Sequence, residues 1–122
     1  MDLGAPIPIL RMFDVDKARA FYLDYLGFKV DFEHRFDPTS PLYMGISRGA
    51  AVLNLSEHHG DACPGSAVRI PVGDIDRLHS ELVAKKYAYY RASIQDMPWG
   101  LREMRVLDPF GNRILFYAVP EK

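Results

Sequence analysis

Apolar and polar residues alternate in several short runs of this chain. In residues 28–33, Phe28, Val30 and Phe32 alternate with polar neighbours and would share one face of a strand, which is typical of a strand with one buried side. Segments rich in glycine, proline and aspartate separate many of these runs and favour turns. By this pattern we predict strands at residues 7–12, 28–33, 42–47, 51–56, 67–72, 87–91, 101–107 and 113–116.

Two segments show the period of amphipathic helices instead. The first covers residues 15–26, where Asp14 can cap the helix start and Gly27 can adopt the left-handed conformation that ends it. The second covers residues 75–85 and carries its own inward apolar stripe. Each helix follows a strand, and three further predicted strands follow each helix.

A tight turn closes the chain's last hairpin. It occupies residues 108–112, where Pro109 fixes φ at the first corner and Gly111 or Asn112 can adopt a positive φ. Strand-forming residues flank it on both sides, so we predict that the chain reverses here as a β-hairpin.

The same order of elements occurs twice. Asp14 before the first helix is matched by Asp74 before the second, sixty positions later. We therefore expect an α+β fold in which two βαβββ units pack around a concave mixed β-sheet. The chain, residues 1–122, is expected to be a single domain with unit 1 at about 5–57, a linker at 58–66 and unit 2 at about 67–119.

Composition narrows the classes of ligand. The chain has 15 basic and 16 acidic residues and a net charge of −1. It lacks the clustered basic residues that would attract nucleic acids or anionic membranes. No apolar run approaches the roughly 20 residues that span a bilayer. Cys63 is the only cysteine, so no internal disulfide can form, and the N-terminus lacks the pattern of a secretory signal. We expect a cytoplasmic protein that binds a small molecule or a protein partner.

The motifs resemble a known superfamily over nearly the whole chain. FDVDKARAFYLDYLGF at 13–28 and PWG at 98–100 before DPFGNRILF at 108–116 are similar to the vicinal oxygen chelate superfamily of glyoxalases, extradiol dioxygenases and bleomycin-resistance proteins. Within it, the bleomycin-resistance proteins share the proline-containing first strand, the GF and DF pairs at 27–28 and 31–32, and PWG before DP.GN.

The resemblance implies where a metal would bind in an enzyme of this superfamily. The four ligand positions fall at about Ile7, Asn54, Ala67 and Leu115. A divalent metal needs nitrogen, oxygen or sulfur donors, which three of these side chains lack, and Asn54 is neutral. We therefore expect no metal, no cofactor and no catalytic residue.

An alternative metal site stays open at the linker. Glu57, His58, His59 and Asp61 are potential ligands there, and Glu33 or His34 could complete the set. Adjacent histidines on an extended segment point to opposite sides, which disfavours His58 and His59 gripping one ion. The alternative function is thus a metal-dependent glyoxalase-like or dioxygenase-like enzyme with non-standard ligands.

The resemblance implies a binding function instead. Bleomycin-resistance proteins hold a planar cationic aromatic tail between aromatic side chains in a groove between two subunits, with carboxylates near its charges. This chain has aromatic and acidic residues that match this arrangement. They predict a protein that sequesters a bleomycin-type glycopeptide antibiotic, or a related aromatic molecule, and confers resistance. Three arginines that can lie near the groove, Arg35, Arg69 and Arg102, disfavour a polycationic ligand. The predicted ligand-binding residues are Trp99, Gly100, Phe32, Phe36, Asp31, Glu33, Tyr43 and Asn54.

Two of these residues have a second interpretation. Phe32 fits ordinary core packing equally well, because it alternates with Phe28 and Val30. Trp99 lies at a turn, where it could cover a neighbouring subunit or contact a ligand.

The first strand suggests how subunits would associate. Pro6 and Pro8 lack amide donors and would leave that strand poorly paired within its own unit. Exchange of this arm between identical chains is a low-cost route to a dimer. We therefore expect a homodimer with two equivalent grooves.

Overall fold

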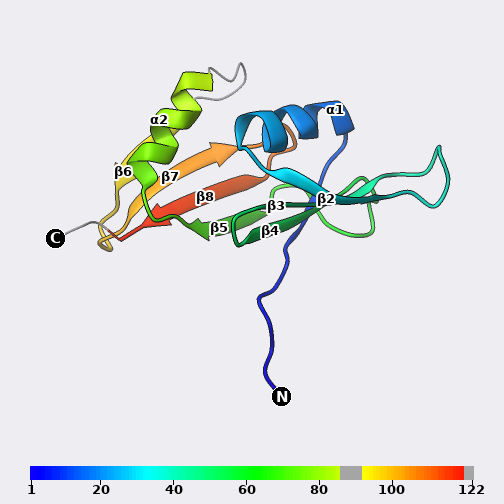
Figure 1. Cartoon of the computed structure of the whole chain (residues 1–122), viewed down its shortest axis with the longest axis horizontal. Coiled ribbons are helices and arrows are strands. Elements are labelled where there is room, and N and C mark those ends of the chain that lie inside the picture. The colour runs from blue at the N-terminus through cyan, green and yellow to red at the C-terminus, as the bar shows by residue number, and fades with distance from the viewer. Residues whose placement is uncertain (86–91, 120–122) are drawn as a thin grey trace.

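The computed structural model describes residues 1–85 and 92–119 as two four-stranded mixed sheets with helices on one side (Figure 1). In the first sheet the strand order is β1-β4-β3-β2, and in the second it is β5-β8-β7-β6. The first unit contains β1 (Ile9–Arg11), α1 (Val15–Ala18), η1 (Arg19–Tyr25), β2 (Lys29–His34), β3 (Tyr43–Arg48) and β4 (Ala51–Ser56). The second contains β5 (Ala67–Pro71), α2 (Ile75–Lys85), β6 (Ser93–Asp96), β7 (Arg102–Leu107) and β8 (Arg113–Ala118).

The two sheets repeat one topology, which confirms the predicted α+β fold of two βαβββ units. In each, the first strand runs parallel to the last one, β1 beside β4 and β5 beside β8, and the other pairs are antiparallel. The buried apolar side chains of both units form one continuous hydrophobic core. No helix in the described part of the chain is long and apolar enough to cross a membrane.

The first helix begins as predicted and then widens. The Asp14 carboxylate accepts a hydrogen bond from the Lys17 amide at 3.0 Å, which caps α1. From Arg19 onward the helix is a π-helix, which the sequence pattern did not predict. The wider turns place Phe21, Tyr22 and Tyr25 together in the core, with ring centroids 4.8 Å apart for the first pair. Packing of these three rings accompanies the departure from α-helical geometry.

The first strand is shorter and better paired than predicted. It covers only Ile9–Arg11, and its residues pair in parallel with β4, starting with Ile9 opposite Asn54. The Pro8 carbonyl also accepts a hydrogen bond from the Asn54 amide at 2.9 Å. The expectation of a poorly paired first strand is therefore wrong for residues 9–11. Residues 1–7 precede this pairing and extend away from the body as an arm (Figure 1).

One strand lies where the pattern gave no signal. This strand is β6 at Ser93–Asp96, which pairs with β7. The strand predicted at 87–91 falls outside the described residues. Ile94 is the only apolar residue of β6, so this strand has no alternation that could reveal it.

Candidate ligand-binding site

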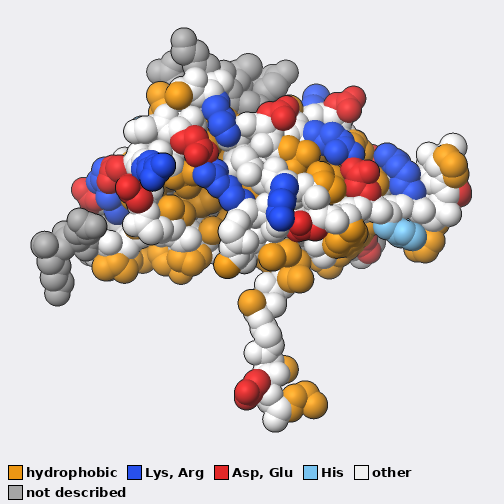
Figure 2. All heavy atoms as spheres, in the orientation of Figure 1, with side chains coloured by type: hydrophobic (Ala, Val, Ile, Leu, Met, Phe, Trp, Pro, Cys, Tyr) orange, Lys and Arg blue, Asp and Glu red, His pale blue; other side chains and the backbone are white. Residues whose placement is uncertain are grey.

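Each sheet has one face that packs toward the helices and the core, and we call the opposite faces the first and second open faces. Cross-strand neighbours share a face, so the register places Phe32, Gly45, Asn54 and Ile9 in one row on the first open face. Residues between them in sequence, such as Met44, are buried on the other side. Figure 2 shows hydrophobic side chains gathering along the edge of the molecule that lies opposite the helices.

An aromatic platform stands on the first open face. The Phe32 ring stacks beside Tyr43 with centroids 6.2 Å apart and an interplanar angle of 19°. It also lies directly over Gly45, where a Cβ atom would come within 2.2 Å of the ring. The Tyr43 hydroxyl accepts a hydrogen bond from the Asn54 side-chain amide at 2.8 Å. Three predicted site residues, Phe32, Tyr43 and Asn54, are thus brought together.

Phe32 does not belong to the core, although its sequence spacing suggested a shared face with Phe28 and Val30. The ladder between β2 and β3 shifts register between Val30 and Phe32, as at a β-bulge. This extra residue turns Phe32 to the opposite face, where it is 48% exposed, whereas Phe28 is buried and Val30 packs against the core. The prediction of one common face was wrong because a bulge is not visible in local alternation.

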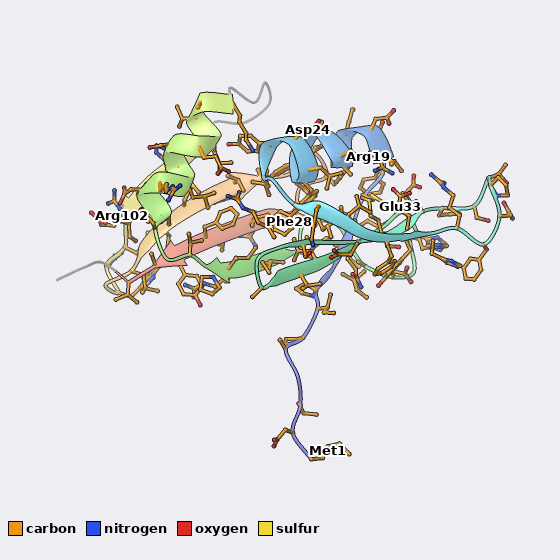
Figure 3. All side chains as sticks on the ribbon, viewed as in Figure 1. Met1, Arg19, Asp24, Phe28, Glu33 and Arg102 are labelled. Atoms are coloured by element: carbon orange, nitrogen blue, oxygen red, sulfur yellow. The ribbon has the colours of Figure 1, made fainter. Side chains whose placement is uncertain are left out.

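The predicted acidic residues do not gather on the first open face. Glu33 pairs with buried Met44 on the helix side of the sheet, where it forms an ion pair with Arg19. Figure 3 shows Arg19 on the helix and Glu33 on the strand beneath it. Asp31 lies at the bulge, 4.0 Å from the Lys29 ammonium group. The carboxylates expected to meet a cationic ligand are therefore near basic side chains of the same chain.

Phe36 lies in the loop after β2 and is 79% exposed. Its ring makes edge contacts with His34 and His58, with centroids 5.0 Å and 6.0 Å away. It forms an aromatic group separate from the Phe32 row.

Two acidic residues of the proposed alternative metal site have other partners. Asp61 accepts a hydrogen bond from the Ser56 hydroxyl at 2.7 Å, and Glu57 accepts one from the Leu42 amide at 2.8 Å. Within residues 1–85 and 92–119, no group of three or more histidine, cysteine or acidic side chains is placed to hold a metal ion. The described residues thus contain no preformed binding site for a divalent cation.

The four positions carried over from the metalloenzymes are also unsuited to a metal. Ile7 lies in the arm, and Asn54 is engaged with Tyr43. Ala67 begins β5, and Leu115 lies on β8. Only Asn54 carries a donor atom, so the residues present do not fit the ion.

Trp99 projects from the turn before β7 and is 61% exposed. The turn is closed by a hydrogen bond from the Gly100 amide to the Met97 carbonyl at 3.0 Å, and Gly100 has a φ of 88°. The indole N–H of Trp99 donates to the Glu103 carboxylate at 2.7 Å. A large apolar ring is thus held at the surface by its one polar atom.

Glu103, on β7, connects Trp99 to residues on β5 and β8. The Arg69 guanidinium lies 3.9 Å from the Glu103 carboxylate and sits 4.4 Å above the Tyr117 ring centroid. Glu103 and Tyr117 are cross-strand partners on the second open face. Neither was predicted as a site residue. The alternation of residues 101–107 places Glu103 and Arg105 on one face of the strand. That pattern could have indicated Glu103 as a candidate site residue.

Of the three arginines considered near the groove, only Arg69 lies on an open face. Arg102 instead binds Asp76 at 2.7 Å and Asp96 at 2.9 Å, beside α2 (Figure 3). Its hydrogen bond and charge lower the pKa of the Asp76 carboxyl. Arg35 donates to the Ser40 carbonyl within its own loop.

The predicted site residues therefore form two main groups in one chain. Phe32, Tyr43 and Asn54 belong to the first sheet, whereas Trp99 and Gly100 belong to the turn that enters the second. Both groups present aromatic rings on open sheet faces, an arrangement on which a flat ligand can stack.

Known proteins share this architecture. A family profile described as "Glyoxalase superfamily protein" matches residues 2–121. The bleomycin-binding protein from bleomycin-producing Streptomyces verticillus, solved with copper(II)-bleomycin, is similar to this chain with 31% sequence identity, a TM-score of 0.72 and 99% of each chain covered. No curated protein matches the chain in sequence.

Two more distant structures share the fold. A bleomycin resistance determinant encoded on the transposon Tn5 has 20% identity and a TM-score of 0.75, over 98% of this chain and 100% of that one. A glyoxalase-related enzyme from Clostridium phytofermentans has 18% identity and a TM-score of 0.77, over 98% of each chain. The similar structures thus include binding proteins and an enzyme. The resemblance predicted from the motifs is confirmed, and this chain belongs to the glyoxalase superfamily.

Proposed function

We propose that this protein binds an aromatic small molecule, a bleomycin-type glycopeptide or a related compound, and confers resistance by sequestering it in the cytoplasm. The observation that carries the proposal is Trp99, a large ring that is 61% exposed while its indole N–H is anchored on Glu103. The Streptomyces verticillus protein, 31% identical over 99% of this chain, is described as bleomycin-binding. Sequestration needs only tight stoichiometric binding and no reacting group.

The first open face offers a second stacking surface. A flat ligand can lie on Phe32, whose position is held by Tyr43 beside it and by the lack of a side chain on Gly45 beneath it. Apolar area removed from water there would stabilise the complex by about 25 cal/mol per Å². Asn54, whose amide is already bound to Tyr43, supplies the hydrogen-bonding side chain of this row.

We further propose a symmetric homodimer that joins the two surfaces. In such a dimer, the first open face of one chain and the second open face of its partner would line one groove, and symmetry would create two of them. The arm of residues 1–7 extends from the body (Figure 1) and is free to cross to a partner. Within this arm, Pro6 lacks an amide donor, which suits an exchanged arm better than a central strand. The Pro8 carbonyl, in contrast, is paired with the Asn54 amide of its own chain.

Titration with metal-free bleomycin tests the binding proposal. Trp99 is the only tryptophan, so its fluorescence reports on one place in each chain. We expect saturable quenching with one ligand per chain and micromolar or tighter affinity. Calorimetry in parallel would detect binding away from Trp99, and the absence of both heat and quenching would overturn the proposal for bleomycin.

Sedimentation at micromolar concentration tests the dimer separately. We expect a single species with twice the mass of the chain, and weaker association once residues 1–7 are deleted. A monomer at that concentration would contradict the shared groove but would leave binding to a single open face testable.

A further inference from the structure

The second open face carries more positive than negative charge. The register places Arg69 and Arg105 on either side of Leu115 in one cross-strand row. Arg113 belongs to the next row on the same face, opposite Leu107. Three guanidinium groups therefore belong to one surface of the sheet. Among the described strand residues, the same register places one acidic side chain on this surface, that of Glu103.

Glu103 offsets only one of these three charges, that of Arg69. One carboxylate oxygen accepts the Trp99 indole N–H and lies 3.9 Å from the Arg69 guanidinium. Arg105 is exposed and has no ion-pair partner among residues 1–85 and 92–119. Two of the three arginines, Arg105 and Arg113, are thus left without a carboxylate within the described chain.

The two acidic residues predicted for the binding site do not add negative charge to the first open face. Glu33 points to the helix side and is paired with Arg19, while Asp31 lies near Lys29. A groove that joins the two open faces would therefore contain stacking rings together with net positive charge. At the position of the arginines, such a groove favours an anionic group of the ligand over a cationic one.

We propose that the ligand of this protein carries an acidic group, a carboxylate or a sulfonate, that Arg105 and Arg69 bind while its ring stacks on Trp99 or Tyr117. The inference rests on the binding site of the proposed function and narrows the class of ligand. Guanidinium groups suit this role because their planar donors match the two oxygens of a carboxylate. Arg69 is already oriented, since it lies over the Tyr117 ring.

Calorimetric titration with matched aromatic probes tests the inference. The probes are 2-naphthoate and 2-naphthamide, which have the same ring but differ in charge. We expect 2-naphthoate to bind on the order of tenfold more tightly, as for a hydrogen bond to a charged group. Arg105→Gln should reduce this preference to about twofold or less, because it removes the unpaired guanidinium in the row that also contains Arg69. Arg77→Gln is the matched control, since Arg77 is exposed on α2 and not on an open sheet face.

Three results would overturn the inference. They are equal binding of the two probes, no binding of either, and an undiminished preference in the double variant Arg69→Gln/Arg105→Gln. The bleomycin titration separates this inference from the proposed function. Bleomycin binding without a preference for 2-naphthoate would leave sequestration standing and refute the anionic ligand. A 2-naphthoate preference without bleomycin binding would support the anionic ligand and overturn the proposal for bleomycin.

Discussion

The Tyr22 hydroxyl donates a 2.6 Å hydrogen bond to the Asp108 carboxylate and so connects the helix of the first unit to the last hairpin turn of the second. Both side chains are buried, at 0% and 4% exposure. The other donors to Asp108 come from its own turn, the Phe110 amide and both the backbone and side-chain amides of Asn112. The Asn112 side chain also donates to the Arg11 carbonyl at 2.9 Å. The turn motif DPFGN therefore holds the two units together as well as reversing the chain.

Tyr22→Phe is expected to lower the free energy of unfolding by about 1–3 kcal/mol, because Asp108 then keeps a buried charge with one donor fewer. Equilibrium denaturation in urea measures the change. Tyr43→Phe is the matched control, since it also deletes a hydroxyl in a hydrogen bond but at the surface of the sheet. Its effect should stay within about 0.5 kcal/mol. Equal losses in the two variants would mean that burial of the Tyr22–Asp108 bond adds nothing.

The same pair predicts how stability changes at alkaline pH. Burial, followed by the charge and hydrogen bond of Asp108, raises the pKa of Tyr22 well above its ordinary value of 10.0. Between the unfolded and the folded pKa the unfolded chain has lost this proton and the folded chain has kept it, so stability falls as pH rises. The expected slope for one group is about 1.4 kcal/mol per pH unit above pH 10.

Urea denaturation of wild type and Tyr22→Phe between pH 9 and pH 11 isolates this effect, because the other titrating groups are common to both proteins. The stability advantage of the wild type should shrink above about pH 10. A constant difference across this range would contradict the raised pKa.

The elements of the fold were predictable where the signal is local. Asp14 caps the first helix and the DPFGN turn reverses the chain, because each depends on neighbours in sequence. The π-helical turns at Arg19–Tyr25 and the bulge before Phe32 depend on packing against residues far away in the chain. Alternation could not show them, and the bulge decides whether Phe32 lies in the core or on an open face.

The candidate site was predictable only in part for a related reason. Trp99 stands out in sequence because a large aromatic residue at a turn is unusual. Its partner Glu103 lies on β7, and Glu103 in turn adjoins Arg69 on β5 and Tyr117 on β8. Only the register of these strands brings the three residues together. Alternation assigns a residue to one face of its strand but does not reveal its cross-strand partner.

Gly45→Ala is expected to disturb the aromatic platform. A Cβ atom there would lie 2.2 Å from a carbon of the Phe32 ring, so the half-exposed ring must swing away. We expect a loss of about 1–3 kcal/mol in stability from this overpacking. Ligand affinity, measured by calorimetry with metal-free bleomycin, should fall because the stacking surface has moved. Gly60→Ala is the control, since a Cβ atom at Gly60 would meet nothing within 4 Å. Undiminished affinity in Gly45→Ala would remove Phe32 from the binding site.

Trp99→Ala is expected to weaken binding by about 2 kcal/mol or more, close to thirtyfold, if its ring is the anchor of the ligand. Trp99 is 61% exposed, so the free energy of unfolding should change by only about 0.5 kcal/mol or less. Calorimetry measures the affinity, since the variant has no tryptophan fluorescence. Trp99→Phe separates stacking from hydrogen bonding, because it keeps an aromatic ring and loses the indole N–H that Glu103 accepts. Retained affinity in Trp99→Phe would assign the effect to stacking, whereas full affinity in Trp99→Ala would exclude Trp99 from the ligand contact and favour a role in covering the partner subunit.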